Sequence, residues 1–339
     1  MNYWGEKLKT LIMKRVLLAL TALFSAFVCE AQQDAQFSQY MFINSAYNPG
    51  ASGIKGMNCF DFIGRQQWLG FEGRPETGLL SYNGTVRKID NFGWGLVGVY
   101  DKIGFEQNMS LKINAAHHFN IGSDGGKLGI GLDLGVLQRS MNGIPKAVDP
   151  TDINIAINGT NDMGFDLGFG AFYRKKDKLY FGISAQKLLP QKLKFGVAQP
   201  KIRQHGYITA GYTQELKDGV KLKPTMLVKT DLTSTQMDVN LTALFNDKIW
   251  LGASYRVQDA FVANVGFNFA NNGKIGLAYD FTTQGLKDKG TFTSWMSDGN
   301  VANQNDNNRS VGSVELYIGY CIIPAPPLDF DIYVDPLFL

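Results

Sequence analysis

From residue 58 onward, apolar side chains occupy every second position of the chain in one segment after another. Clear examples lie at 128–136, 249–257, 261–269 and 275–281. A period of two is typical of a β-strand with one apolar face, and runs of about ten residues fit strands that cross a bilayer at a tilt. No stretch beyond the N-terminal region stays apolar for the ~20 residues that a membrane helix needs. The pattern therefore predicts a membrane protein that crosses with strands.

The two faces of these strands carry different residues. The apolar face has aromatic side chains near strand ends, such as Phe92, Trp94 and Tyr100, as in the interfacial girdles of membrane barrels. The other face mixes Gly, Asn and Ser with charged residues, as expected for a barrel interior. A soluble sandwich would instead pack two apolar faces together and would rarely bury ionisable groups. We therefore expect an all-β fold, a transmembrane antiparallel β-barrel.

Counting the alternating segments gives fourteen strands. An even number places both ends of the barrel, and so both termini, on one side, which we expect to be the periplasm. The connections on that side are short and rich in Gly, Asn, Asp and Lys, whereas the long ones at 140–162, 188–204 and 284–311 fall on the other side. The strands are predicted at 58–66, 77–88, 92–101, 105–119, 126–139, 163–175, 178–187, 205–215, 221–232, 235–245, 248–258, 260–270, 273–283 and 312–322.

The N-terminal region has the three parts of an export signal. Met13-Lys14-Arg15 precedes an apolar run at 16–28, and Cys29-Glu30-Ala31 offers a small-x-small cleavage site. We expect residues 1–31 to be removed, with Met13 as a possible true start. Their loss takes four basic and two acidic residues and lowers the net charge from +3 to about +1. A balance so close to neutral argues against a nucleic-acid partner, which needs a concentrated basic face.

Two segments flank the barrel at 58–322. Residues 32–57 are rich in aromatic side chains, and residues 323–339 form a Pro-rich tail that should leave the sheet. Either segment could plug the lumen or offer a docking strip in the periplasm, and the tail could also be an unstructured terminus. We single out the first segment for partner binding because it is not needed to close the sheet. Its candidate residues are Phe37, Gln39, Tyr40, Tyr47 and Asn48.

The lumen-facing positions carry both signs of charge in comparable number. Pairing across the lumen would hold it closed, whereas a selective pore usually has an excess of one sign. The sequence therefore favours a plugged or paired interior over a conducting channel. The residues concerned are Asp61, Arg65, Lys112, His118, Asp133, Asp166, Lys229, Asp231, Asp238, Arg256 and Asp280.

The sequence contains no spacing of residues that is typical of a catalytic or metal-binding site. His117 and His118 point to opposite faces of one strand and cannot share a metal, and His205 has no neighbouring ligand. No Ser/His pairing suggests a nucleophile. We expect neither an enzyme, nor a cofactor, nor a metal site.

Only two cysteines remain after the predicted cleavage. Closure of a fourteen-stranded barrel brings the last strand beside the first, which places Cys59 and Cys321 near the periplasmic rim, both facing inward. A disulfide would link the two strands, and a register slip of two residues would separate the sulfurs.

Residues around the first and third strand ends form recognisable clusters. Arg65 and Gln67 share the inward parity, and Trp68 lies on the outward parity near the rim, where an indole is favourable. Gly70, Gly73 and Pro75 are expected to shape the first extracellular loop. Asp101, Lys102 and Gly104 are expected to form a tight turn, and direct contact with a partner is the alternative for all of these residues.

These clusters resemble motifs of the PorP/SprF family of type IX secretion system membrane proteins from Bacteroidetes. The similar stretches are QQDAQFSQYMFINSAYNPGASG at 32–53, RQQWLGFEGRPET at 65–77 and GWGLVGVYDKIG at 93–104. The chain departs from the family at 43–49, where the Asn-Pro element is rearranged, and in a tail that extends beyond the usual last strand.

The resemblance implies a non-enzymatic outer-membrane component that helps to secrete or attach large surface proteins, such as gliding adhesins. It also implies periplasmic partners from the same secretion system. A passive or solute-specific outer-membrane channel is the alternative that the strand pattern leaves open.

Overall fold

The structure is a computed structural model that describes residues 34–86, 89, 91–141, 161–176, 178–191, 202–217, 219–269, 272–283 and 311–323. The predicted signal peptide and the tail beyond Ile323 lie outside these residues.

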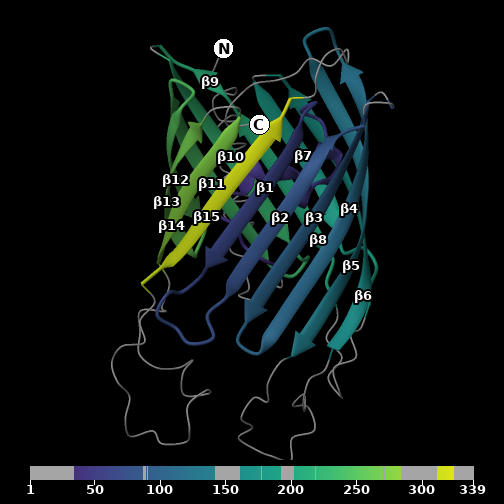
Figure 1. The fold of residues 1–339 in the computed structure, drawn as a ribbon, viewed down its shortest axis with the longest axis vertical. Coiled ribbons are helices and arrows are strands. Elements are labelled where there is room, and N and C mark those ends of the chain that lie inside the picture. The colour runs from purple at the N-terminus through teal and green to yellow at the C-terminus, as the bar shows by residue number, and fades with distance from the viewer. Residues whose placement is uncertain are drawn as a thin grey trace, which may run out of the picture.

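The described chain is almost entirely β-strand (Figure 1). Three short helical turns, η1 (Tyr40–Phe42), α2 (Asn44–Tyr47) and η2 (Pro49–Ala51), precede the first strand. No helix in the described ranges has the length and apolar character needed to cross a bilayer. The strands are β1 (Asn58–Gln66), β2 (Glu76–Thr85), β3 (Phe92–Ile103), β4 (Glu106–Ile121), β5 (Gly126–Met141), β6 (Asn161–Lys175), β7 (Leu179–Gln186), β8 (His205–Tyr212), β9 (Gln214–Glu215), β10 (Val220–Thr230), β11 (Thr235–Phe245), β12 (Ile249–Arg256), β13 (Ala260–Phe269), β14 (Gly273–Thr282) and β15 (Ser313–Ile322).

Every pairing between neighbouring strands is antiparallel, and the sheet closes on itself. The last strand, β15, pairs with β1, and β10 pairs with both β8 and β11. The two-residue β9 continues β8 along the same edge of β10, so the wall has fourteen strands. The prediction of a fourteen-stranded antiparallel barrel is therefore confirmed.

Side chains alternate between the lumen and the outer face along each strand. Outward-facing Leu134, Phe165 and Phe281 have 64%, 69% and 56% of their surface exposed. Inward neighbours such as Asp133, Asp166 and Asp280 are at most 4% exposed. An apolar outer wall over a polar interior is the arrangement expected of a barrel in lipid.

The turn between β3 and β4 is tighter than the sequence suggested. Asp101 and Lys102 belong to β3, where they pair with Asn108 and Gln107 of β4. Only Gly104 and Phe105 form the turn, and Gly104 takes a φ of 58° that glycine adopts without strain. The prediction that Asp101 and Lys102 lie in the turn was wrong, because the β3–β4 ladder continues to Ile103.

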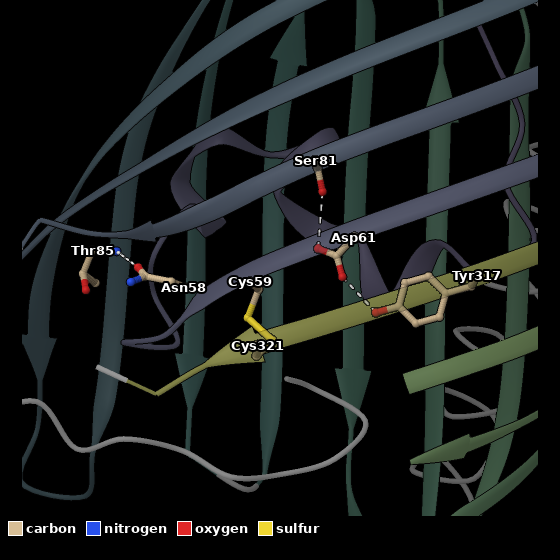
Figure 2. The surroundings of a disulfide bond; sticks show 7 residues. All are labelled: Asn58, Cys59, Asp61, Ser81, Thr85, Tyr317 and Cys321. Atoms are coloured by element: carbon tan, nitrogen blue, oxygen red, sulfur yellow. Dashed lines mark hydrogen bonds between the residues drawn. A yellow bond between two sulfur atoms is a disulfide. The ribbon is translucent and has the colours of Figure 1, made fainter. Parts of the chain in front are cut away.

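A disulfide between Cys59 and Cys321 links the first and last strands (Figure 2). The two residues are direct partners in the register of β1 with β15. Beside them, Asp61 of β1 accepts hydrogen bonds from the Tyr317 hydroxyl of β15 at 2.8 Å and from Ser81 of β2 at 3.3 Å. The strands that lie furthest apart in the chain are thus joined by a covalent bond as well as by their backbones.

We expect peptide mapping without reductant to recover a Cys59–Cys321 cross-linked peptide. A double Cys59→Ser, Cys321→Ser variant should lose about 2–4 kcal/mol of unfolding free energy, because the bond closes a loop that spans most of the barrel. Urea unfolding in detergent measures the loss. Recovery of two free thiols would contradict the bond.

Residues 34–57 run through the lumen and are here called the plug. Its first residues lie at the end of the barrel that carries the long loops, where Asp34 contacts Lys187 and Tyr207. Its last residues reach the opposite end, where β1 begins and β15 ends. The sequence left two positions open for this segment, as a plug in the lumen or as a docking strip in the periplasm. The structure shows it inside the lumen.

The prediction that both chain ends lie on one side must therefore be considered separately for the barrel strands and for the residues that precede β1. The first and last strands do begin and end at the rim with the short turns. The described residues that precede β1, however, come from the opposite mouth. The strand count could not reveal this, because it says nothing about the path of a segment outside the sheet.

Candidate functional site

A buried network of charged and polar side chains lies where the plug meets the barrel wall. Three strands near the seam supply its charged centre: Arg65 on β1, Asp280 on β14 and Glu315 on β15. Alternation along each strand turns these side chains into the lumen, where all three are at most 3% exposed. The pairing of β14, β15 and β1 creates this site, because it brings Arg65 next to two carboxylates that lie more than two hundred positions further along the chain.

Ser38 of the plug lies at the middle of this charged centre. Its backbone N–H and that of Gln39 donate to the two oxygens of the Glu315 carboxylate, at 2.7 and 2.8 Å. Its hydroxyl donates to Asp280 at 2.7 Å and accepts from Arg65 Nη1 at 2.8 Å. A carboxylate that receives two consecutive backbone N–H groups fixes both the position and the direction of the segment.

Two arginines connect the carboxylates around Ser38. Arg65 contacts Asp280 at 2.7 Å and Glu315 at 3.2 Å. Arg256 contacts Asp280 at 2.9 Å and Asp238 at 3.0 Å. A buried charge needs an opposite charge nearby, and each of these groups has one within 3.2 Å. We call these five charged residues together with Ser38 the anchor network.

Aromatic side chains of the plug also pack against the barrel wall. The Phe42 ring stacks on Tyr317 with centroids 4.5 Å apart, and Tyr47 packs against Tyr207 at 5.3 Å. The Tyr40 hydroxyl lies 3.2 Å from Thr225 Oγ1. The five aromatic rings belong to one apolar cluster that joins the plug to the wall.

Wall side chains also satisfy the backbone of the plug. Gln186 donates to the carbonyl of Tyr47 at 2.9 Å, and Asn114 donates to that of Ser45 at 2.8 Å. Asn48 of the plug reaches outward and donates to the carbonyls of Ala171 and Ile183, at 2.9 and 3.1 Å. An irregular segment away from water needs such partners for its peptide groups.

Lumen glycines let the backbone of the plug approach the wall. A Cβ atom on Gly131 of β5 would lie 2.5 Å from the carbonyl carbon of Pro49 and 2.6 Å from the nitrogen of Gly50. No real Cβ tolerates such a contact with backbone, so this position needs a residue without a side chain.

Gly131→Ala is expected to destabilise the barrel by about 1–3 kcal/mol, because the added methyl overlaps backbone that cannot rotate away. Urea unfolding measures the change. Gly78→Ala on β2 is the matched control, since a Cβ there meets nothing within 4 Å. Equal unfolding midpoints for the two variants would contradict close packing of the plug.

The candidate partner-binding residues all face the wall in this structure. Phe37, Gln39, Tyr40, Tyr47 and Asn48 are at most 6% exposed. They were singled out because their segment is not needed to close the sheet. A segment that is not part of the sheet can also be buried in the lumen. The structure places them between plug and wall, where Phe37 and Tyr47 also line a cavity, and their contact with a partner stays a prediction.

The motif that follows Arg65 shapes the mouth of the barrel. Gln67 donates through its side chain to Gln36 of the plug at 3.2 Å, and its backbone N–H donates to the Pro75 carbonyl at 2.9 Å. Trp68, Gly70 and Gly73 take positive φ angles of 50°, 99° and 71° in the loop between β1 and β2.

The same loop also contacts the next hairpin. The N–H of Gly104 donates to the Gly73 carbonyl at 2.9 Å, and Asp101 accepts from Thr77 Oγ1 at 2.6 Å. Two of the motifs that the sequence singled out are therefore neighbours at the mouth with the long loops.

Sequence reasoning missed Glu315 and Ser38. Glu315 shares the inward parity of Cys321, so alternation along β15 could have placed it in the lumen. Nothing comparable pointed to Ser38, because its partners are supplied by distant strands. Within the described residues, no three His, Cys, Asp or Glu side chains come together as a metal site would require.

A family profile described as type IX secretion system membrane protein PorP/SprF matches residues 29–296 of the chain. A search of curated proteins finds no match.

Among solved structures, the chain is similar to a FadL homologue from Pseudomonas aeruginosa, with 13% identity, a TM-score of 0.44, and coverage of 81% of this chain and 93% of the other. The toluene transporter TbuX of Ralstonia pickettii shows 9% identity and a TM-score of 0.43 over 81% of this chain and 92% of its own. The outer-membrane protein Omp33 of Acinetobacter baumannii shows 7% identity and a TM-score of 0.42 over 79% of this chain and all of its own.

Proposed function

Because the chain belongs to the PorP/SprF family of type IX secretion system membrane proteins, we propose that it is a plugged outer-membrane barrel that supports secretion or surface attachment of a large cargo protein. Such cargo would be of the adhesin type, and the barrel would act without catalysis. In this proposal the rim with the short turns faces the periplasm and docks other components of the secretion system, while the long loops face outward.

The anchored plug is the observation that carries the proposal. A channel for solutes needs a continuous water path, whereas here residues 34–57 occupy the lumen, and hydrogen bonds to buried charged side chains of the wall hold them there. The barrel then serves through the surfaces that it presents at its two rims. The alternative, a small-solute channel, requires the anchor network to open.

Deletion of the gene separates the two functions. We expect the deletion strain to lose a specific large surface protein, as measured by mass spectrometry of proteins shaved from intact cells, while uptake of small solutes stays unchanged. Restoring the wild-type gene should restore the surface protein. Normal surface proteins together with reduced solute uptake would overturn the proposal in favour of the channel.

A further inference from the structure

The inner end of the lumen, at the rim with the short turns, has an excess of positive charge. Asp61 of β1 faces this space and lies in one row across the sheet with Lys274 of β14, through Gly319 of β15. Four cations from the plug and the wall gather here, and we call them the basic vestibule: Lys55, Lys127, Arg174 and Lys274. Each of the four has a contact of its own, so the feature of interest is their total charge.

The four cations of the basic vestibule lie around one aromatic ring of the plug. Lys127 of β5 and Arg174 of β6 are direct partners in the register of these two strands. Arg174 and Lys55 line one cavity of about 20 Å³ together with Phe42, and Lys274 Nζ lies 5.5 Å from the centroid of the Phe42 ring. Like charges directly opposite each other destabilise a sheet, so negative charge at this point would stabilise it.

The basic vestibule differs in this respect from the anchor network. The anchor network combines three carboxylates with two arginines, so that its charges nearly cancel. In the basic vestibule, four cations accompany the single carboxylate of Asp61. Glu215 and Asp247 lie further along the same rim, where both contact Lys221, at 4.0 and 2.9 Å. The inner end of the lumen therefore keeps a net positive charge, which favours an anionic occupant.

The segment that follows β15 has charge of the opposite sign. Residues 324–339 contain Asp329, Asp331 and Asp335 but no lysine or arginine. These aspartates occupy alternating positions, so an extended segment would present them on one face. The three prolines within residues 324–327 favour an extended conformation over a helix. The sequence thus offers an extended acidic segment.

The acidic segment begins beside the basic vestibule and is long enough to cross it. β15 ends at Ile322, whose partner in β1 is Asn58 at the inner rim (Figure 1). Sixteen extended residues span up to roughly 50 Å. The wall has fourteen strands at a spacing of ~4.8 Å, so the lumen is much narrower than this reach.

We propose that residues 324–339 fold back across the inner mouth and dock on the basic vestibule, with their aspartates toward its cations. The tail would then close the lumen from the side opposite to the entry of the plug. A tethered segment is present at an effective concentration on the order of millimolar, whereas a separate acidic protein must be recruited. The inference does not depend on the proposed function, because it concerns contacts within one chain.

A photo-crosslinker in the full-length barrel tests where the tail lies. With a benzophenone amino acid in place of Phe330, illumination of the purified barrel in detergent should link the tail to residues 51–57 or to the inner ends of β5 and β6, as mapped by mass spectrometry. The same group in place of Phe281, which is 56% exposed on the outer wall, is the control and should not reach these segments.

Neutralising the tail tests whether charge holds it there. A triple Asp329→Asn, Asp331→Asn, Asp335→Asn variant leaves every strand unchanged, and we expect the yield of these crosslinks to fall about fivefold. The three are changed together because a single solvated ion pair contributes little. Equal yields in the two barrels, or crosslinks only to other segments, would overturn the proposal.

Chemical labelling gives an independent measurement without a crosslinker. In the triple variant, Lys55 should react about threefold faster with a water-soluble acetylating reagent than in the wild type, because exposed amines react faster than amines covered by ion pairs. Lys248 is the matched control, since it is exposed in a turn of the same rim and should react equally in both. Unchanged labelling of Lys55 would contradict docking. In intact cells, crosslinks from position 330 only to another protein would assign the tail to a partner and overturn the proposal.

Discussion

Replacing Arg65 with alanine is expected to destabilise the barrel by about 3–5 kcal/mol, because it leaves the buried Glu315 carboxylate without a cation and Asp280 with only Arg256. Arg65 contacts Asp280 at 2.7 Å and Glu315 at 3.2 Å, and both partners are at most 1% exposed. The same change removes a donor to the Ser38 hydroxyl, so the plug should loosen as well. Urea unfolding of the barrel in detergent, at neutral pH, measures the loss.

Arg74→Ala provides the control for charge alone. Arg74 lies near Glu76 at 3.6 Å, with 35% of its side chain exposed, and a solvated pair of this kind contributes ~0–1 kcal/mol. If Arg65→Ala and Arg74→Ala unfold at the same urea concentration, the anchor network does not hold the fold together. A double Arg65→Ala, Glu315→Gln variant should recover part of the loss, since it removes the carboxylate whose cation is missing.

Removal of the plug should turn the barrel into an ion channel. With residues 37–53 replaced by a glycine-serine linker of equal length, the lumen keeps its polar and charged lining but loses the side chains that fill it. Water then enters, and a wide polar lumen conducts ions. We expect conductance in planar bilayers at least tenfold above that of the wild-type barrel.

The control for this experiment is a linker replacement elsewhere. Exchange of the exposed turn at 122–125 for glycine and serine alters a hairpin without touching the plug, and should leave the conductance at the wild-type value. A plugless barrel that inserts into the bilayer yet conducts no more than wild type would show that other parts of the chain close the lumen.

The barrel could be predicted closely because a strand in a membrane wall obeys a local rule. Each residue faces either lipid or lumen, so alternation alone placed most strand ends within three residues of those observed and turned Asp133, Arg256 and Asp280 inward. The count also placed the last strand beside the first but left their register open, and the structure pairs Cys59 directly with Cys321.

The plug could not be predicted in the same way because its contacts are not local. Ser38 meets Asp280 and Glu315, which the pairing of β14 with β15 brings together, and Arg65, which barrel closure adds. Aromatic residues such as Tyr40 and Tyr47 were candidates for partner binding, since their segment is not needed to close the sheet. Whether such a segment meets a partner or fills a lumen depends on the space inside the barrel, which no pattern along the chain records.

The meeting of β1 with β15 also constrains the order in which the molecule can form. Arg65, Asp280 and Glu315 stand on β1, β14 and β15, so the grip on Ser38 is incomplete until the last two strands have arrived. The plug precedes β1 in the chain and lies inside the wall, so the wall must wrap around it as the seam closes. Contacts between the two ends of a chain form slowly, because closing so long a loop costs entropy before any bond compensates. Seating of the plug and closure of the wall are then one late event, which the Cys59–Cys321 bond makes permanent.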